Sequence, residues 1–360
     1  MGASLAYELV TKGVDVVLVD RHHAGKATDA GAGILSPETF LDPDDAWAEL
    51  AVAAGVHHRD LNDRVADDGA GGTGYDTCGL AKVAMQEAED EWVVKATEIA
   101  ERRTPGIVTT VDFDEVRRMF PPIGRVRSGI YSPVAARIDG RLATSAISLA
   151  AAGRGLRIVD AEATSLEIAG NRVTAVVTSD GKVATGALAI AGGAWSSKFA
   201  AHLRSDLKVF PMKGQIVHMR VPGADTSRWA IVQPIMSHYL VPWPDGRVVC
   251  GGTLEAEAGF DPAPTAGGIH ELFRECLKTA PGLATATFVE VRVGLRPASS
   301  DGRPVLGRLP GWSNVHVATG HGTEGLLMGP YTSALVAEGI VAGSDPKQIE
   351  DLSPARFVES

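Results

Sequence analysis

Cysteine is scarce in this chain, which has only Cys78, Cys250 and Cys276 among its 360 residues. Their spacing matches neither a disulfide framework nor a zinc site, so we expect reduced, buried thiols in a cytoplasmic protein. A serine within a glycine-rich nucleophile elbow is also missing. These absences argue against zinc-dependent and serine-dependent hydrolysis.

Positively charged residues are outnumbered by negatively charged ones. The chain has 34 lysines and arginines and 44 aspartates and glutamates, which gives a formal net charge of -10. This balance argues against nucleic acid as a partner and does not favour an anionic membrane surface. No apolar run approaches the roughly 20 residues of a membrane span, and no basic leader typical of a signal peptide precedes the first helical pattern. The length predicts two interleaved domains of an ordinary globular enzyme.

The beginning of the chain lacks the first half of a nucleotide-binding unit. Residues 3–12 predict a helix that Gly13 stops, and residues 14–19 predict an apolar strand that ends at Asp20. These elements form the second half of a dinucleotide-binding βαβ unit, in which the acid holds the ribose hydroxyls. Of the glycine-rich turn only Gly2 remains, and either a misassigned start or a real truncation would give this pattern. We expect the chain as given to bind a dinucleotide weakly, and a version extended upstream by one strand and a Gly-rich turn to bind it tightly.

Hydrophobic periodicity and turn residues predict most of the remaining elements. Helices are expected over residues 42–67, 87–103, 112–120, 139–153 and 265–279. Strands are expected over residues 77–85, in four short segments between 156 and 191, and over residues 207–220, 229–236, 238–243 and 247–252. Asp112 is expected to cap its helix. His57 and His58 have no acidic or cysteine partner at metal spacing, which favours packing roles for both.

Two glycine-rich segments organise the last third of the chain. They are Val-Gly-Leu-Arg-Pro at 293–297 and Ala-Thr-Gly-His-Gly-Thr-Glu-Gly at 318–325, joined by Asp-Gly-Arg-Pro-Val-Leu-Gly at 301–307. Each of the two follows a strand-like run, and the second leads into a helical pattern over 326–341. Such a turn presents backbone N–H groups and a positive helix end, which suit an anion or a ring that becomes anionic on reduction. Arg296 is a planar cation suited to bind a carboxylate through two hydrogen bonds.

These segments resemble the carboxy-terminal signature of the D-amino-acid oxidase superfamily, and glycine oxidase and D-amino-acid dehydrogenase share the pattern. Further matches follow in the expected order, at residues 28–35, 191–196, 211–215 and 239–242. The resemblance covers nearly the whole chain. It implies a mixed α/β and α+β fold, in which a doubly wound, Rossmann-like FAD-binding domain is interleaved with an antiparallel-sheet substrate domain.

The resemblance also implies domain boundaries. The FAD-binding domain is expected at residues 1–40, 139–200 and 290–345, the substrate domain at 41–138 and 201–289, and a loosely held polar tail at 346–360. The strand expected over 289–293 would lead back into the FAD-binding domain.

Non-covalent FAD is the cofactor that the resemblance implies. The residues it assigns to FAD are Gly2, Asp20, Arg21, Thr28, Ala30, Gly31, Gly33, Ile34, Leu35, Ala163, Gly192, Gly193, Gly320, His321, Gly322, Thr323, Glu324, Gly325 and Leu326. Ala163 would pass its backbone near the adenine, and Gly192 and Gly193 would lie on the diphosphate side. The loop 320–326 would direct N–H groups at the flavin N1–C2=O edge, where negative charge develops as hydride arrives. His321 is either a polar group behind this loop or a packing residue.

The substrate pocket has three candidate side chains by the same resemblance. Arg296 would anchor the substrate carboxylate, Tyr239 would close the carboxylate or amine side, and Leu254 would line an apolar wall. A surface arginine and a core tyrosine are the alternatives for the first two. Glycine oxidases carry an arginine where this chain has Thr323, whereas D-amino-acid dehydrogenases do not. We assign no acid or base, because hydride transfer requires a positioned Cα–H, an unprotonated amine and a fixed carboxylate.

The expected activity is therefore that of an FAD-dependent oxidoreductase acting on CH–NH2 donors. Its substrate would be glycine or a D-amino acid, oxidised at the C–N bond by hydride transfer to flavin N5 and released after imine hydrolysis. Oxygen or a quinone-linked carrier would accept the electrons, and a homo-oligomer stays open. Two alternatives remain, namely oxidation of a secondary amine or imino acid such as sarcosine, and a cofactor-free ligand-binding remnant.

Overall fold

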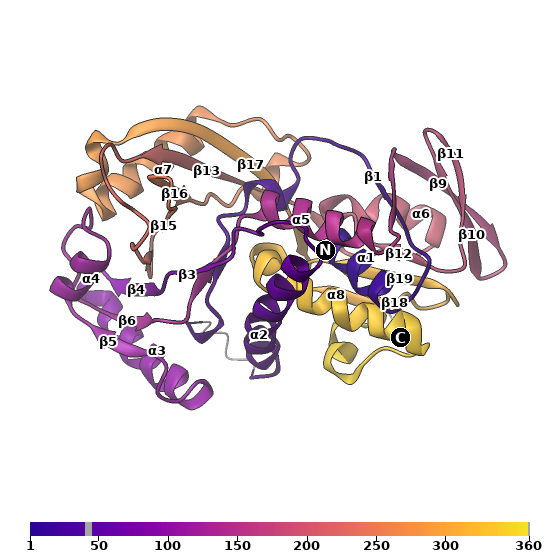
Figure 1. The fold of residues 1–360 in the computed structure, drawn as a ribbon, viewed down its shortest axis with the longest axis horizontal. Helices are drawn as coiled ribbons and strands as arrows, with labels where there is room; N and C mark the ends of the chain where they lie inside the picture. The colour runs from indigo at the N-terminus through magenta and orange to yellow at the C-terminus, as the bar shows by residue number, and fades with distance from the viewer. Residues whose placement is uncertain (40–44, 359–360) are drawn as a thin grey trace.

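The computed structural model describes residues 1–39 and 45–358. Figure 1 shows two halves of different construction. One half carries a large sheet flanked by α3 (Asp90–Arg103), α4 (Phe113–Met119) and α7 (Ala266–Thr279). The other half carries small sheets beside α1 (Gly2–Thr11), α5 (Gly140–Gly153) and α8 (Gly325–Ala342). The mixed α/β and α+β architecture expected from the sequence is confirmed.

The large sheet has eight strands in the order β17-β13-β16-β15-β14-β4-β6-β5. Their bounds are Thr287–Ser299, Val209–Arg220, Arg247–Gly251, Tyr239–Pro242, Ile231–Pro234, Leu80–Ala84, Ser128–Ser132 and Thr109–Val111 in that order. Neighbouring strands are antiparallel except β14 and β4, which run parallel. The sheet therefore joins residues 80–132 to residues 209–299, two segments that are separated in the sequence by residues 133–208, which contain α5 and strands of the other half.

The course of β17 differs from the expectation. Residues 289–293 were expected to lead back into the nucleotide-binding half, but β17 is longer and pairs with β13 from Arg220↔Thr287 to Val209↔Ser299. Arg296 therefore lies on a strand of the large sheet, in register with Met212. The pairing partner, rather than the local pattern, decides where this segment lies.

The nucleotide-type half contains two parallel strand pairs. One is β1 (Val17–Asp20) with β8 (Arg157–Asp160), and the other is β12 (Leu188–Ile190) with β19 (Val315–Thr319). β18 (Val305–Arg308) extends the second pair in the antiparallel sense. Among the described residues, β1 pairs only with β8, and β12 only with β19, so the two pairs form separate sheets.

Two smaller sheets complete the fold. β9 (Ala163–Ala169), β10 (Arg172–Thr178) and β11 (Gly181–Ala184) form a meander, so residues 156–191 contain five strands where four were expected. β7 (Ala136–Arg137) pairs with β2 (Ile34–Leu35) and with β3 (Asp76–Thr77). This sheet fixes the end of the 28–35 loop against the strand that precedes α5.

Side-chain caps place several helices where the sequence predicts them. Asp112 accepts a hydrogen bond from the Glu115 backbone N–H at the start of α4, Asp139 caps α5, and Thr265 caps α7. Such caps satisfy backbone donors that the first helical turn leaves unpaired. The helix α2 is described from Asp45 to Asp67, and the first three residues of its expected range lie outside the described residues.

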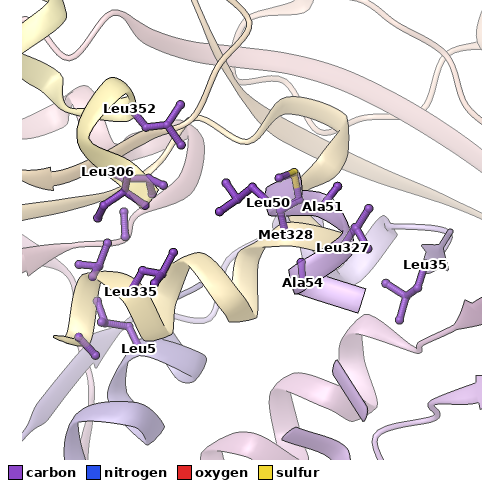
Figure 2. Packing of buried hydrophobic residues seen from close by; sticks show 14 of the residues in the cluster. Leu5, Leu35, Leu50, Ala51, Ala54, Leu306, Leu327, Met328, Leu335 and Leu352 are labelled. Atoms are coloured by element: carbon purple, nitrogen blue, oxygen red, sulfur yellow. The ribbon is translucent and has the colours of Figure 1, made fainter. Parts of the chain in front are cut away.

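The core of the nucleotide-type half is built around α8, which packs against α1 and α2. Figure 2 shows Leu327, Met328 and Leu335 of this helix among the side chains of Leu5 and Leu50. The residues Gly322–Ala342 have the length and mean hydropathy (1.2) of a membrane-crossing helix, and 56% of that window is buried inside the protein. Glu324 and Glu338 interrupt this segment, so it is not the continuous apolar run that was sought in the sequence. Its apolar surface is used as the packing centre of this half.

The carboxy-terminal segment is held more firmly than expected. Residues Lys347–Leu352 and Pro354–Phe357 form short 3-10 helices, and Ile349 and Leu352 are buried in the same core. Arg356 forms an ion pair with Asp301 at 2.7 Å. The expectation of a loose polar tail was wrong for the described residues, because these two apolar side chains dock on β18.

Candidate functional site

A continuous cavity of about 1650 Å³ runs between the two halves. It is larger than the roughly 300–1,000 Å³ of most ligand pockets. The facing edges of β1 and β12 line one part of it, and the large sheet lines another. All candidate residues for FAD and substrate line this cavity except Leu35 and Gly320. Leu35 is instead buried in the α8 core.

The loop 28–35 approaches its neighbours so closely that glycine is required. A Cβ on Gly31 would stand 2.3 Å from the Leu326 side chain, and a Cβ on Gly33 would stand 1.9 Å from the Ile138 carbonyl oxygen. Gly33 also has a positive φ of 83°, which side chains rarely adopt. The loop therefore lies directly against Leu326 at the start of α8, and both segments line the cavity.

Gly294 of β17 joins the same contact from the other side. A Cβ there would be 3.0 Å from both Ala27 and Ala30, which belong to the short helix Ala27–Ala30. The Leu295 backbone N–H also donates to the Gly25 carbonyl at 2.8 Å. The first glycine-rich segment thus brings the substrate sheet against the 28–35 loop.

The second glycine-rich segment forms a 3-10 turn, Gly322–Glu324, that leads into α8. Its backbone lies beside the cavity, so the N–H groups of the first helical turn and the positive end of the helix dipole face that space. His58 donates from Nε2 to the carbonyl oxygens of Leu326 and Leu327 at 2.9 Å each, which fixes this turn. His58 is thus a positioning residue, in line with the packing role expected for it.

His321 lies buried behind this turn. Its Nε2 is 2.9 Å from the Thr332 hydroxyl, while its Nδ1 has no hydrogen-bond partner in the described part of the chain. Burial, reinforced by the nearby amino group of Met1, lowers the pKa of His321 to about 3. The ring is therefore neutral at ordinary pH, and it combines packing behind the loop with one hydrogen bond to α8.

Arg296 lies flat across two strands of the large sheet. A Cβ on Gly214 would be 2.0 Å from its Nη1, and a Cβ on Gly252 would be 3.0 Å from its Nη2, so a side chain at either position would displace the guanidinium. Nη1 donates to the Thr253 carbonyl at 2.9 Å. Among the described residues no carboxylate lies within ion-pair distance of this guanidinium. Its charge is therefore available to an anion in the cavity.

Tyr239 converges on the same corner. A Cβ on Gly252 would stand 3.2 Å from its hydroxyl, and Arg296 lies beside that hydroxyl. Burial raises the pKa of Tyr239 to about 12, although Arg296 opposes this shift. The hydroxyl is therefore a neutral donor next to a free cation. Leu254 lines the cavity and is 65% exposed.

A polar network behind the sheet holds Arg296 in place. The Gln215 backbone N–H donates to the Thr253 hydroxyl at 2.9 Å, and that hydroxyl donates to Glu255 at 2.6 Å. The Gln215 amide donates to Glu255 at 2.7 Å. The buried Lys213 ammonium lies 3.8 Å from the same carboxylate. The motif at residues 211–215 pointed to this stretch but not to its role, which depends on contacts with residues 253–255.

Lys82 and Glu324 are two ionisable residues that line the cavity. Lys82 was not singled out from the sequence, and Glu324 was assigned only to FAD. Burial lowers the pKa of the Lys82 ammonium to about 8. Burial raises the pKa of Glu324, whose carboxylate accepts a hydrogen bond from the Thr323 hydroxyl at 2.9 Å. Lys82 stands on β4, in a run without any motif, so only the sheet pairing shows that it reaches the site.

The opposite end of the cavity carries the residues expected near the adenosine. Asp20 forms an ion pair with Lys26 at 2.7 Å, and Arg21 pairs with Glu162 at 2.9 Å. Lys198 donates to the Ala163 carbonyl at 3.1 Å. These side chains are partly exposed, and Asp20 keeps 47% of its side-chain surface accessible for a ribose.

Gly2, Gly192 and Gly193, the glycines expected on the diphosphate side, also line the cavity. Gly193 has a positive φ of 54°, and its carbonyl accepts a hydrogen bond from the Thr319 hydroxyl at 2.9 Å. A Cβ on Gly2 would meet only ordinary contacts, 3.5 Å from Leu18 and 3.7 Å from Ala191. The part of the cavity expected to face a diphosphate is therefore bordered mainly by backbone and small side chains.

Comparison with known proteins gives a consistent result. Residues 1–339 match the family described as FAD dependent oxidoreductase. The uncharacterized oxidoreductase YurR of Bacillus subtilis is 35% identical over 98% of this chain and 95% of its own length. Glycine oxidase from Pseudomonas aeruginosa is 29% identical over 96% of this chain and 93% of its own.

Two solved structures extend the comparison. Iminodiacetate oxidase from Chelativorans sp. BNC1 superimposes with a TM-score of 0.92 at 34% identity, covering 98% of this chain and 96% of that one. Glycine oxidase from Geobacillus kaustophilus superimposes with a TM-score of 0.89 at 24% identity, covering 99% and 96%, which is a likeness of fold.

Proposed function

Because the chain belongs to the FAD dependent oxidoreductase family, with FAD as its cofactor, we propose that it oxidises the C–N bond of a small amino or imino acid. The observation that carries this proposal is the corner formed by Arg296 and Tyr239. There a guanidinium without a carboxylate partner among the described residues and a neutral hydroxyl donor face one cavity. This corner suits the carboxylate of an amino acid.

The chain's own residues would bind and orient the substrate. Arg296 would hold the α-carboxylate through two parallel N–H donors, and the Tyr239 hydroxyl would add a third hydrogen bond. Gly214 and Gly252 keep the guanidinium in the plane of the sheet, so the carboxylate is fixed in direction as well as in place. Leu254 would exclude water from the Cα.

Bound FAD supplies the acceptor for the hydride that leaves the substrate Cα. The 28–35 loop and the start of α8 would hold the reacting ring, since Gly31 and Gly33 leave no room for a side chain between them and their neighbours. Backbone N–H groups at residues 322–326 would stabilise negative charge on the ring edge. Ala163, Asp20 and Arg21 would hold the adenosine without a covalent link.

Both primary and secondary amines remain within this proposal. Glycine oxidases are among the relatives, and iminodiacetate oxidase, which is named for a secondary amine, superimposes over almost the full chain. In this chain Thr323 stands where the glycine oxidase pattern has an arginine. The shorter side chain leaves room on that side of the cavity for a second substituent on the amine nitrogen.

The test uses the purified protein with its flavin. Its absorbance spectrum first measures flavin content, which separates an enzyme from a cofactor-free binding protein. Glycine, D-alanine, sarcosine and iminodiacetate are then added without oxygen, and bleaching of the flavin is followed. We expect at least one of them to bleach it in the parent protein and to do so far more slowly in Arg296→Met. A flavin-loaded protein that none of the four bleaches would contradict the proposal. Oxygen and a quinone added to the reduced protein then identify the electron acceptor.

A further inference from the structure

The cavity contains a second cation, Lys82, on the same face of the large sheet as Arg296 and Tyr239. The sheet register establishes this alignment independently of the cavity lining. Lys82 pairs with Gln233 on β14, and Val232↔Leu240 places Gln233 opposite Tyr239 on β15. Residues that face each other across neighbouring strands project to the same side of a sheet.

The same register continues from Tyr239 to Arg296. Tyr239 pairs with Gly251, and Gly251 pairs with Ile216 on β13. Met212, which pairs with Arg296, lies four residues from Ile216 and so on the same face. Lys82, Tyr239 and Arg296 therefore lie on one face of the sheet, and all three line the cavity. Arg296 is four residues farther along β17 than Arg292, the partner of Ile216, and its guanidinium reaches back to the Tyr239 hydroxyl.

Lys82 is a partly buried cation that keeps hydrogen-bond donors to spare. Its Nζ donates to the Thr39 carbonyl at 3.1 Å and lies 5.1 Å from the centre of the Trp92 ring. Among the described residues it forms no ion pair, although the charge of Glu324 acts on it from farther away. An ammonium group has three N–H donors, so those that Thr39 does not use can bind a carboxylate in the cavity.

The spacing between Lys82 and Tyr239 suits a short dicarboxylate. The two residues are two strands apart, which is about 10 Å between their backbones, and the Arg296 guanidinium lies beside the Tyr239 hydroxyl. Carboxylate carbons separated by three chain atoms lie about 5 Å apart. With a C–O bond of about 1.2 Å and a hydrogen bond of about 2.8 Å at each end, such a molecule spans up to about 13 Å between its donors. A substrate of this length would cover Gln233 and reach Lys82 from the Tyr239 end.

We propose that the substrate is an amino or imino acid with a second carboxylate, which Lys82 binds while Arg296 and Tyr239 bind the first. This inference rests on the proposed function and adds the substrate class to it. With iminodiacetate as the example, Cα loses a hydride to FAD and the nitrogen loses a proton, so that a C=N bond forms and FAD gains two electrons. Water then adds to the C=N bond, giving glyoxylate and glycine.

Binding of a non-reacting analogue tests the second site separately from the chemistry. Glutarate has the length of iminodiacetate but carries CH2 in place of NH, and its monoamide, glutaramate, replaces one carboxylate by a neutral group of the same size. Calorimetry and the shift of the flavin spectrum measure both affinities in the flavin-loaded protein. We expect glutarate to bind at least tenfold more tightly than glutaramate. Equal affinities in the unmodified protein would overturn the proposal without any variant being needed.

Variants then identify the cation responsible. Lys82→Met is expected to bring the ratio of the two affinities close to one, because it removes the charge and keeps the chain length. Lys95→Met, which removes an exposed lysine from α3, is expected to keep the ratio of the parent. Loss of both affinities by the same factor in Lys82→Met, with an unchanged melting temperature, would show a merely structural role and overturn the proposal.

Turnover separates this inference from the proposed function. The ratio of kcat/KM for iminodiacetate to that for its monoamide should exceed ten in the parent and approach one in Lys82→Met. Oxidation of glycine together with equal binding of glutarate and glutaramate would overturn the dicarboxylate site and leave the proposed function intact. A preference for glutarate in a flavin-loaded protein that oxidises none of the amines would support the binding site and overturn the proposed function.

Discussion

Replacing Arg296 by methionine removes the guanidinium while keeping an unbranched side chain across Gly214 and Gly252. In the parent, the guanidinium donates to the Thr253 carbonyl and has no carboxylate partner among the described residues, so the incoming carboxylate is its main electrostatic contact. Truncating one member of a buried, hydrogen-bonded charge pair costs about 2–5 kcal/mol. At 1.4 kcal/mol per factor of ten, kcat/KM should fall by about 30-fold to about 4,000-fold.

The assay is the rate of flavin reduction without oxygen, measured against substrate concentration. Flavin content and melting temperature should stay near those of the parent, because Arg296 lies at the substrate end of the cavity. Arg292→Met is the matched control, since Arg292 lies on the same strand and is paired with Glu290 at 2.7 Å. We expect its kcat/KM to stay within about twofold of the parent, as is usual for a partly exposed ion pair. An unchanged kcat/KM in Arg296→Met, or an equal loss in both variants, would refute the assignment of the carboxylate anchor.

Three further predictions concern the rest of the site. Tyr239→Phe should cost about 1 kcal/mol in kcat/KM, because one neutral hydrogen bond is lost; a value equal to the parent would make Tyr239 structural. Gly33→Ala should lower flavin content and melting temperature far more than the control variant Gly71→Ala. Both glycines have φ near +80°, but only a Cβ on Gly33 would lie 1.9 Å from the Ile138 oxygen. Equal losses in the two variants would refute this reasoning. Burial lowers the pKa of His321 from 6.5 to about 3, so between these pH values the unfolded state binds a proton that the folded state does not. The free energy of unfolding therefore decreases as the pH falls from about 6.5 towards 3. His321→Gln should therefore have a flatter melting curve against pH than the parent, and parallel curves would contradict the assignment.

Local signals in the sequence were sufficient for much of the fold. Asp112 and Asp139 mark helix starts because their side chains complete the backbone hydrogen bonds of the first turn, which is a short-range effect. The glycines at 31 and 33 were assigned only to FAD, and their contacts with Leu326 and Ile138, which come from distant parts of the chain, could not be named from the sequence. Short-range chemistry therefore predicted where helices begin, but not where distant segments crowd together.

Long-range pairing accounts for the errors. The strand β17 was expected to belong to the nucleotide-type half, yet its thirteen residues follow β13, to which its periodicity gives no clue. The end of the chain reads as polar, but Ile349 and Leu352 find an apolar surface on the α8 core. In both cases a segment takes its place from a partner far away in sequence, and the free energy of that packing exceeds the local preference.

The same difference between local signals and long-range pairing applies to the candidate site. Arg296 could be found from the sequence because a glycine and a proline beside it form a motif, whereas Lys82 stands in an ordinary strand more than 200 residues away. The two are brought onto one face only by the pairing of six strands, and a shift of one residue at any of those pairings would turn one cation to the opposite face. The residue proposed to bind the common carboxylate is thus marked by a local motif in the sequence. The residue proposed to select among substrates depends on sheet register, which explains why the family and its cofactor were predicted from the sequence and a second cation was not.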